Sequence, residues 1–195
     1  MKRHAIVATL VFAGLRISEL LDLRWTDVDL AHGWLTVGES KTNAGIRRVR
    51  IRAVLRDVFA ECKPTDADPV ALVFGTSEGK RQSPSNVRQR VLSKAAEKSK
   101  VPLPALTPHS LRRTFCSLLF ELGEPHPVVM REMGHTDAKL TLNVYAQVMD
   151  RDDKENERLR ALVNGASWGR LGTGAQTSDP PGDPVVPAES AEARS

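Results

Sequence analysis

The spacing of hydrophobic residues predicts a chain that is mainly helical in its first 163 residues. The apolar run 6–12 predicts a short helix that ends near Gly14. The next segment has a buried face formed by Ile17, Leu20, Leu21 and Leu23. Further along, helical spacing predicts five more helices, over residues 83–98, 106–123, 127–133, 136–148 and 152–163.

Two short segments predict strands, and the second of them alternates between apolar and polar residues. These are residues 34–40 and 47–52, and the turn-forming stretch "KTNAG" lies between them, so we expect a hairpin with Lys41 near its tip. In the second strand, Arg48, Arg50 and Arg52 alternate with apolar residues. The apolar run 71–76 predicts a third strand. The fold class expected is therefore α+β, mainly α-helical with a small antiparallel β-sheet of three strands.

Local signals mark where the predicted helices begin and end. Ser83 or Ser85 is the expected cap of the helix 83–98, whose basic residues lie on its exposed face. Thr107 caps the helix 106–123 and is followed by proline at the first helical position, a common combination. Gly123 and Gly134 are expected to end the two helices that precede them, and Thr136 to cap the next.

The C-terminal segment 164–195 differs in composition from the rest. It is rich in Gly, Pro, Ser and Ala, so it has too few large apolar residues to form a core, and we expect it to be disordered. It holds two arginines and four acidic residues, so its own charge is −2. Because the whole chain has a net charge of +4, the body 1–163 carries +6. A basic body suits a polyanionic partner, although many basic domains only have a solvated cationic surface.

Other bulk features narrow the class of protein. The chain has no run of 18 apolar residues, so we expect no membrane span. Cys62 and Cys116 are two lone cysteines without metal or redox spacing, which favours a reducing compartment. A zinc site on His109, His126 and His135 lacks close spacing and sulfur ligands, so no metal is expected.

Several residues are candidates for phosphate chemistry, and each has a simpler explanation when taken alone. His109 and Arg112 share one face of a helix start, where an anion is favoured. The simpler explanation is that His109 only occupies the N-terminal turn of the helix and that Arg112 is a surface residue. Arg16 follows a Gly-Leu pair that ends a helix and is placed to bind a phosphate. Its simpler explanation is a solvated arginine paired with Glu19.

The other three candidates likewise have both a functional and an ordinary structural explanation. Lys41 reaches a groove from a hairpin tip or is a typical turn lysine. His135 follows Gly134 and contributes to a site or closes a helix. Tyr145 is the single tyrosine of the chain and lies next to Val144, so it is a nucleophile or a helix-packing residue.

Taken together, these six residues are the groups needed to attack a phosphodiester without a metal. Arginines and a histidine stabilise charge on the phosphate oxygens, a lysine protonates the departing oxygen, and a tyrosine captures the phosphate covalently. A metal-free ribonuclease that uses His109, His135 and Lys41 is an alternative, but it leaves Tyr145 and both arginines unused.

The order of these blocks resembles the catalytic domain of the tyrosine recombinases, the phage integrase family. The resemblance rests on "AGLRISELLDLRWTDVDL", "GESKTNAGIRRVRI", "TPHSLRRTFCSLLFELG" and "VVMREMGHTDAKLTLNVYAQVM". It implies a tyrosine-recombinase catalytic-domain fold over residues 1–163. It also implies site-specific DNA recombination, by integration or excision, through a 3′-phosphotyrosyl intermediate. A related tyrosine-type topoisomerase is an alternative that the Gly-His-to-Tyr spacing disfavours.

The resemblance also implies a role for each matched residue. Arg16 and Arg112 clamp the scissile phosphate, His109 contacts it and transfers a proton, and His135 donates a hydrogen bond to it. Lys41 is the general acid for the 5′ oxygen, and Tyr145 is the nucleophile. The predicted DNA-binding residues are Lys41, Arg47, Arg48 and Arg50.

The resemblance implies double-stranded DNA as the partner, with no metal and no cofactor. It further implies a homotetramer on paired DNA sites, in which the segment 152–163 docks on a neighbouring subunit, and a place in the bacterial cytoplasm near the nucleoid. Family members carry an additional N-terminal DNA-binding domain, whereas Arg16 is close to Met1 here. We therefore expect an N-terminally truncated catalytic domain. A catalytically inactive DNA-binding remnant, or a regulator of an integrase, is the alternative.

Overall fold

The computed structural model describes residues 3–38, 47–99, 106–135, 141–142, 144–145, 161 and 163. The predictions for Lys41, for the cap at Thr136, for residues 152–160 of the last helix and for the C-terminal segment 164–195 lie outside these residues. Within them, the prediction of a mainly helical chain with a three-stranded antiparallel sheet is confirmed.

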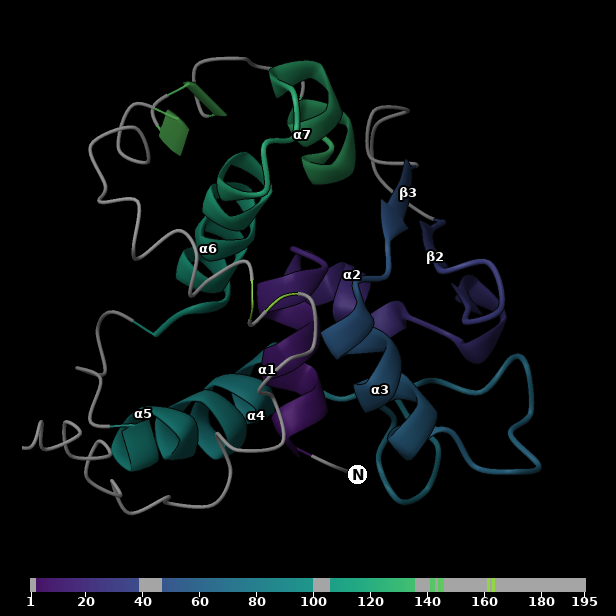
Figure 1. Ribbon diagram of the computed structural model, residues 1–195. Helices are drawn as coiled ribbons and strands as arrows, with labels where there is room; N and C mark the ends of the chain where they lie inside the picture. Colours follow the sequence, from purple (N-terminus) through teal and green to yellow (C-terminus); the bar gives the residue numbers. More distant parts are fainter. Residues whose placement is uncertain are drawn as a thin grey trace, which may run out of the picture.

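The first helix forms the centre of the molecule. Helix α1 (Arg3–Phe12) packs against α3 (Ala53–Cys62) on one side and α6 (Pro108–Glu121) on another (Figure 1). Its side chains Ile6 and Leu10 are fully buried, as the apolar run predicted. Helix α1 ends before Gly14, which has a left-handed backbone (φ 59°), and the short α2 (Ile17–Asp22) follows.

The predicted helix 83–98 is present, and a wide turn interrupts it. It consists of α4 (Pro84–Val87), the π-helical turn η3 (Arg88–Leu92) and α5 (Ser93–Ser99). Ser83, rather than Ser85, is its cap, because the Ser83 hydroxyl accepts a hydrogen bond from the Asn86 N–H at 3.2 Å.

The two helices nearest the predicted site begin and end at the expected residues. Thr107 caps α6 by accepting a hydrogen bond from the Ser110 N–H at 3.0 Å, and Pro108 is its first residue. Helix α7 (His126–Met133) ends at Gly134 in the left-handed conformation, φ 62° and ψ 43°. Glycine adopts this conformation without the steric cost that a Cβ brings.

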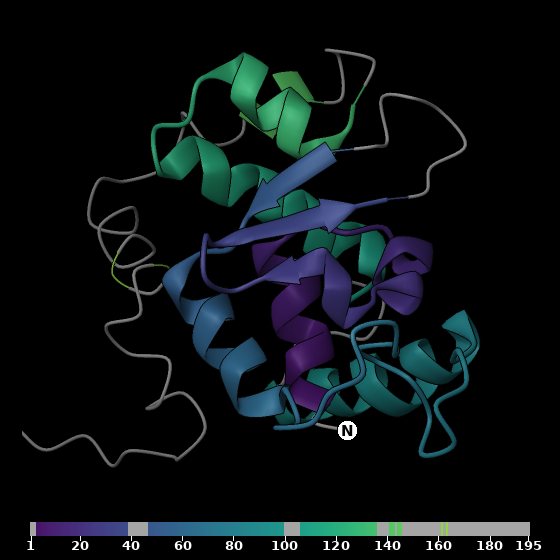
Figure 2. The same cartoon turned by 90° about the vertical axis from the view of Figure 1, so that its right-hand side faces the viewer.

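The sheet has the strand order β1-β2-β3, and all pairs are antiparallel. Strands β2 (Trp34–Val37) and β3 (Arg47–Arg50) form the predicted hairpin, with Leu35 opposite Val49. Strand β1 (Val28–Asp29) follows a 3-10 turn η1 (Trp25–Asp27) and completes the sheet. Figure 2 shows β2 and β3 crossing the molecule, with α7 beside β3.

The third strand was predicted in the wrong segment. Residues 71–76 form only an isolated bridge between Arg24 and Leu72. The Trp25 N–H donates to Ala71 O and the Val73 N–H donates to Leu23 O, but turns lie on both sides of this pair of bonds. The apolar side chain of Phe74 is buried in a loop, so its burial gives the segment a strand-like pattern without strand pairing.

Gly14 is a point at which α1 and α6 come close together. A Cβ built on Gly14 would lie 2.1 Å from Phe115 Cδ1, and Phe115 is itself buried. Its left-handed backbone and this contact both require glycine. Gly79 has a similar backbone, φ 74°, but open space around it.

We predict that Gly14→Ala lowers the free energy of unfolding by about 2 to 4 kcal/mol, because overpacking adds to the left-handed backbone penalty. Gly79→Ala is the matched control and loses only about 1 kcal/mol from the backbone penalty. Denaturant unfolding of both variants measures the difference. Equal losses in the two variants would contradict the close approach of α1 and α6.

Candidate functional site

The C-terminal end of α7 gathers three arginine side chains from separate parts of the chain. Arg47 Nε donates to Glu132 O at 2.6 Å, Arg112 Nη2 donates to Met133 O, and Arg16 Nη2 donates to Gly134 O at 3.2 Å. The last carbonyls of a helix have no partner inside the helix and form its negative end. Each of three successive carbonyls is thus satisfied by a different guanidinium.

A buried carboxylate lies between two of these arginines. Glu19 accepts from Arg47 through both oxygens, each at 3.0 Å, and from Arg16 Nη1 at 2.8 Å. It also accepts from the Arg16 backbone N–H at 2.7 Å, as an acidic residue in the first turn of a helix often does. Burial alone raises the pKa of Glu19, but the hydrogen bonds and charge of Arg47, together with Arg16, lower it to about 2. Glu19 is therefore ionised.

Arg112 is buried, and both of its terminal nitrogens donate hydrogen bonds to backbone carbonyls. Its Nη1 donates to Gly14 O and its Nη2 to Met133 O, so it connects the end of α1 to the end of α7. Gly14 O is available because α1 has already ended. Burial, followed by the nearby charges of Arg47 and Arg16, lowers the pKa of Arg112 to about 10, which still leaves it protonated at neutral pH. The explanation of Arg112 as a surface residue is thus excluded.

His135 extends the same group of residues. Its backbone N–H closes α7 by donating to Met130 O, and its Nδ1 lies 3.1 Å from Thr141 Oγ1. Burial, followed by the charges of Arg112, Arg16 and Arg47, lowers the pKa of His135 to about 4. A neutral imidazole has one donor and one acceptor nitrogen, so His135 acts here through hydrogen bonds rather than charge.

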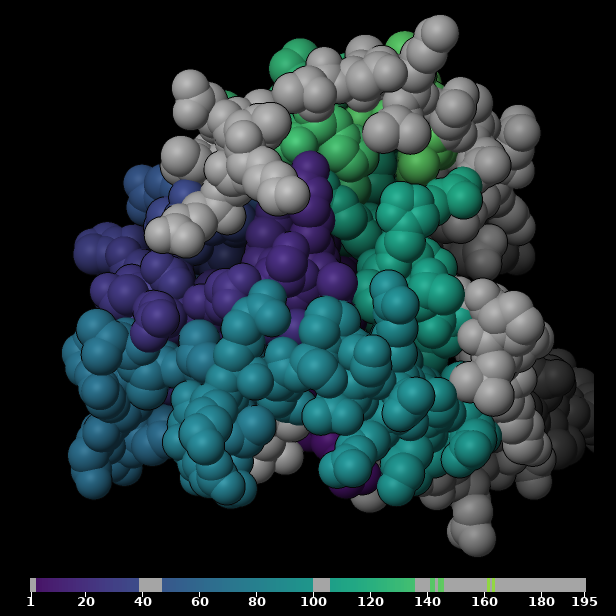
Figure 3. Space-filling view, turned by 180° about the vertical axis from the view of Figure 1, so that it is seen from behind, coloured from purple at the N-terminus to yellow at the C-terminus, as the bar shows by residue number. Residues whose placement is uncertain are grey.

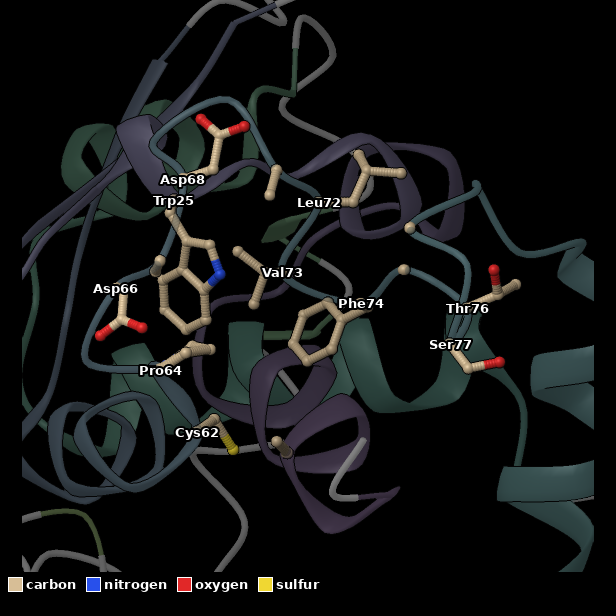
Figure 4. A pocket seen from close by; sticks show the side chains of 15 residues that line it. Trp25, Cys62, Pro64, Asp66, Asp68, Leu72, Val73, Phe74, Thr76 and Ser77 are labelled. Atoms are coloured by element: carbon tan, nitrogen blue, oxygen red, sulfur yellow. The ribbon is translucent and has the colours of Figure 1, made fainter.

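Two adjoining cavities share the residues His109 and Arg112. The first, of about 230 Å³, also contains His135 and Val144, and the second, of about 490 Å³, also contains Arg16. The structure therefore brings together four of the six predicted catalytic residues. A larger cavity of about 590 Å³ lies elsewhere, beside Trp25, Cys62 and Phe74, and none of the predicted catalytic residues lines it (Figure 4).

Tyr145 lies beside the first cavity without lining it. Its neighbour Val144 lines the cavity, whereas the Tyr145 ring packs edge-on against Phe120, with the ring centroids 5.0 Å apart. The Tyr145 side chain is 39% exposed. Cys116 also lines the first cavity, but burial raises the pKa of its thiol to about 11, so it stays protonated and is a poor nucleophile.

The predicted DNA-binding residues of β3 divide between its two faces. Arg48 and Arg50 are exposed, and the Arg48 guanidinium lies over the Trp34 ring, 4.9 Å from its centroid. Arg47, in contrast, is buried: its side chain is 2% exposed and binds Glu19, so the structure gives it an internal partner on this face. The alternation along β3 places Arg47 on the inward face together with Val49.

Sequence reasoning missed the role of Glu19, which it treated only as a surface partner of Arg16. Helical spacing was the available signal, since Glu19 lies on the face of α2 shared with Arg16 and has Leu20 as its neighbour. Among the described residues, no cluster of three His, Cys, Asp or Glu side chains is placed to hold a metal ion. No described helix is long and apolar enough to cross a membrane.

These observations define a pair of cavities lined by arginine and histidine side chains on a mainly helical domain with a small antiparallel sheet. The chain matches the phage integrase family over residues 1–152. It is 33% identical to the integrase of Staphylococcus phage L54a, with 77% of this chain and 49% of that protein aligned. It is 32% identical to tyrosine recombinase XerC of Alcanivorax borkumensis, with 72% and 46% aligned. The chain therefore belongs to the phage integrase family.

Solved structures agree with this assignment. The Tn1549 transposon integrase, in complex with transposon right end DNA, is 26% identical with a TM-score of 0.57, covering 81% of this chain and 57% of that one. XerA recombinase shares the fold at 22% identity and a TM-score of 0.60, covering 82% and 55%. The chain spans about half the length of the curated relatives it matches.

We predict that Arg47→Met lowers the free energy of unfolding by about 3 to 5 kcal/mol, because the buried carboxylate of Glu19 loses the guanidinium that pairs with it. The double variant Arg47→Met, Glu19→Gln recovers part of this loss, since no uncompensated charge remains. Arg50→Met on the exposed face of the same strand is the control and changes stability by about 0.5 kcal/mol or less. Denaturant unfolding measures all three, and equal effects of Arg47→Met and Arg50→Met would exclude the buried pair.

Proposed function

We propose that this chain breaks and rejoins DNA strands through a covalent bond between Tyr145 and a 3′ phosphate, as the catalytic part of a site-specific recombinase. The observation that carries the proposal is the convergence of Arg16, Arg112, His109 and His135 on two adjoining cavities. Membership of the phage integrase family supports it.

The arginines are suited to bind a phosphate because the protein already holds them in place. A guanidinium has five N–H donors, and Arg112 uses two of its terminal nitrogens on Gly14 O and Met133 O, leaving the other donors for an anion. Arginine carries about 2 kcal/mol of rotamer entropy, most of which is lost on folding rather than on binding. Charge that develops on the phosphate oxygens then meets donors that need no rearrangement.

The proposed reaction balances without a metal or a redox step. The Tyr145 hydroxyl gives up its proton, for which His109 is the proposed acceptor, and the Tyr145 oxygen attacks the phosphorus. The bond from phosphorus to the 5′ oxygen breaks, and the departing 5′ oxygen takes a proton. Lys41 is proposed as the donor of that proton, and it lies outside the described residues. Attack by a 5′ hydroxyl of another strand reverses these steps and releases Tyr145.

The histidines have different proposed roles. His109 is exposed at the edge shared by both cavities, so it is placed to contact the phosphate directly. His135 is neutral at pH 7, so one ring nitrogen donates a hydrogen bond to a phosphate oxygen while the Nδ1 side faces Thr141.

The proposed partner is double-stranded DNA, and exposed Arg48 and Arg50 are proposed to contact its backbone beside the hairpin. We also propose that the complete protein acts as a tetramer on paired DNA sites, with the segment 152–163 on a neighbouring subunit, at the bacterial nucleoid. The support for these statements is the family assignment together with the basic body of the chain.

We predict a covalent protein–DNA adduct with nicked duplexes whose short 5′-hydroxyl strand diffuses away after cleavage. A pool of such duplexes with randomised sequence supplies the unknown site, and adducts that survive SDS are recovered and sequenced. Tyr145→Phe gives no adduct because it lacks the attacking oxygen. Leu142→Ala, an exposed residue of the same segment, is the control and keeps the adduct.

An adduct formed by Tyr145→Phe would overturn the assignment of the nucleophile. Salt-dependent DNA binding by the wild type without any adduct would instead favour a non-enzymatic DNA-binding remnant. The packing of Tyr145 on Phe120, outside the cavity lining, is the observation on which this second function rests.

A further inference from the structure

The cavity that contains Arg16 has a further arginine in its wall, which the catalytic roles above do not use. Arg88, the first residue of η3, lines this cavity of about 490 Å³ together with Arg16, His109 and Arg112. Contacts between α4 and α2 bring Arg88 next to the segment of Arg16. Viewed from behind, the teal helices 84–99 and 108–121 border the purple N-terminal segment on one face (Figure 3).

A local irregularity of the helix coincides with Arg88. In η3 the Ser93 N–H donates to Arg88 O, five residues back, and Ser93 Oγ donates to the same carbonyl at 3.1 Å. Such π-helical turns are rare in proteins as a whole, and those that occur are frequently found at functional sites. The wide turn keeps Val87 and Leu92 buried while Arg88 stays exposed at the cavity.

The charge around the cavity exceeds what one phosphodiester balances. Arg16, Arg47, Arg88 and Arg112 together with Glu19 carry a net charge of +3, and one scissile phosphate supplies a single negative charge. No carboxylate is among the described residues that line this cavity. Within the described part of the chain, the Arg88 guanidinium makes no hydrogen bond or ion pair, so its donors face solvent.

We propose that Arg88 binds a second backbone phosphate of the same DNA strand, adjacent to the scissile phosphate held by Arg16 and Arg112. This inference rests on the proposed function of the site. Successive phosphates of one strand rise by about 3.4 Å along the duplex, so the phosphate next to the scissile one stays close to the cavity that Arg16, Arg88 and Arg112 line. Contacts of this kind fix the register of the strand without reading its sequence, so Arg88 places the scissile linkage over Tyr145.

The test uses the duplex recovered from the randomised pool, with single methylphosphonate linkages placed one at a time on either side of the scissile phosphate. A methylphosphonate is neutral, so it removes the charge that Arg88 contacts. For the wild type, one flanking linkage lowers the rate of adduct formation by roughly tenfold, the effect of losing one charged hydrogen bond. Arg88→Gln is slower by a similar factor on ordinary DNA and is insensitive to that same linkage.

Arg56→Gln is the matched control, because Arg56 is an exposed arginine of α3 that lines none of the cavities described here. It keeps the full sensitivity of the wild type at every linkage. The proposal would be overturned if every flanking methylphosphonate slowed adduct formation by Arg88→Gln as much as it slows adduct formation by the wild type. If the wild type binds DNA without cleaving it, a duplex is recovered from the same pool by retention of the bound complex instead. Methylphosphonates placed one at a time along that duplex and measured by equilibrium binding then test Arg88 and separate its failure from that of the proposed function.

Discussion

The site depends on the hydrogen bonds between the last carbonyls of α7 and three arginine side chains. Without an acceptor, three guanidinium groups at close range repel one another, and burial penalises each charge. The helix end supplies three acceptors in succession, at Glu132, Met133 and Gly134. Because the arginines come from the residue preceding α2, from β3 and from α6, this one helix end also fixes the positions of those elements relative to one another.

Gly134 and Glu19 make this arrangement possible in different ways. The left-handed backbone at Gly134 stops α7, so no further helical turn uses the carbonyls of Glu132, Met133 and Gly134. His135 Nδ1 then lies 3.1 Å from Thr141 Oγ1. Glu19 supplies the negative charge that the carbonyl dipoles lack, and its ionisation is maintained by Arg47. Arg47 and Arg16 thus both bind Glu19, and Arg16, which is partly exposed, keeps further donors for a ligand.

Sequence patterns predicted the features that depend on neighbouring residues. Thr107, Pro108 and Gly134 mark helix ends through local chemistry, and the structure places each as expected. The spacing of His109 and Arg112 on the first turns of one helix predicted that the two share a face, and both line the same cavity. The resemblance to the tyrosine recombinases then related these segments to one another, which no local pattern does.

The features that sequence patterns missed depend on partners far along the chain. Arg47 pairs with Glu19, 28 residues away, and with Glu132 O, 85 residues away, and strand alternation alone gives no partner. The third strand was missed because Val28–Asp29 has only two residues, too few to show alternation. The wide turn at Arg88 has no composition signal, and its two flanking apolar residues, Val87 and Leu92, are both buried.

The most direct measurement is a crystal structure of the protein grown with tungstate, a phosphate analogue whose anomalous scattering marks its position. The account predicts one tungstate ion between Arg16, His109 and Arg112, with both arginines still bonded to the carbonyls of Gly134 and Met133. Arginines turned away from the end of α7, or tungstate bound elsewhere while this site stays empty, would contradict it.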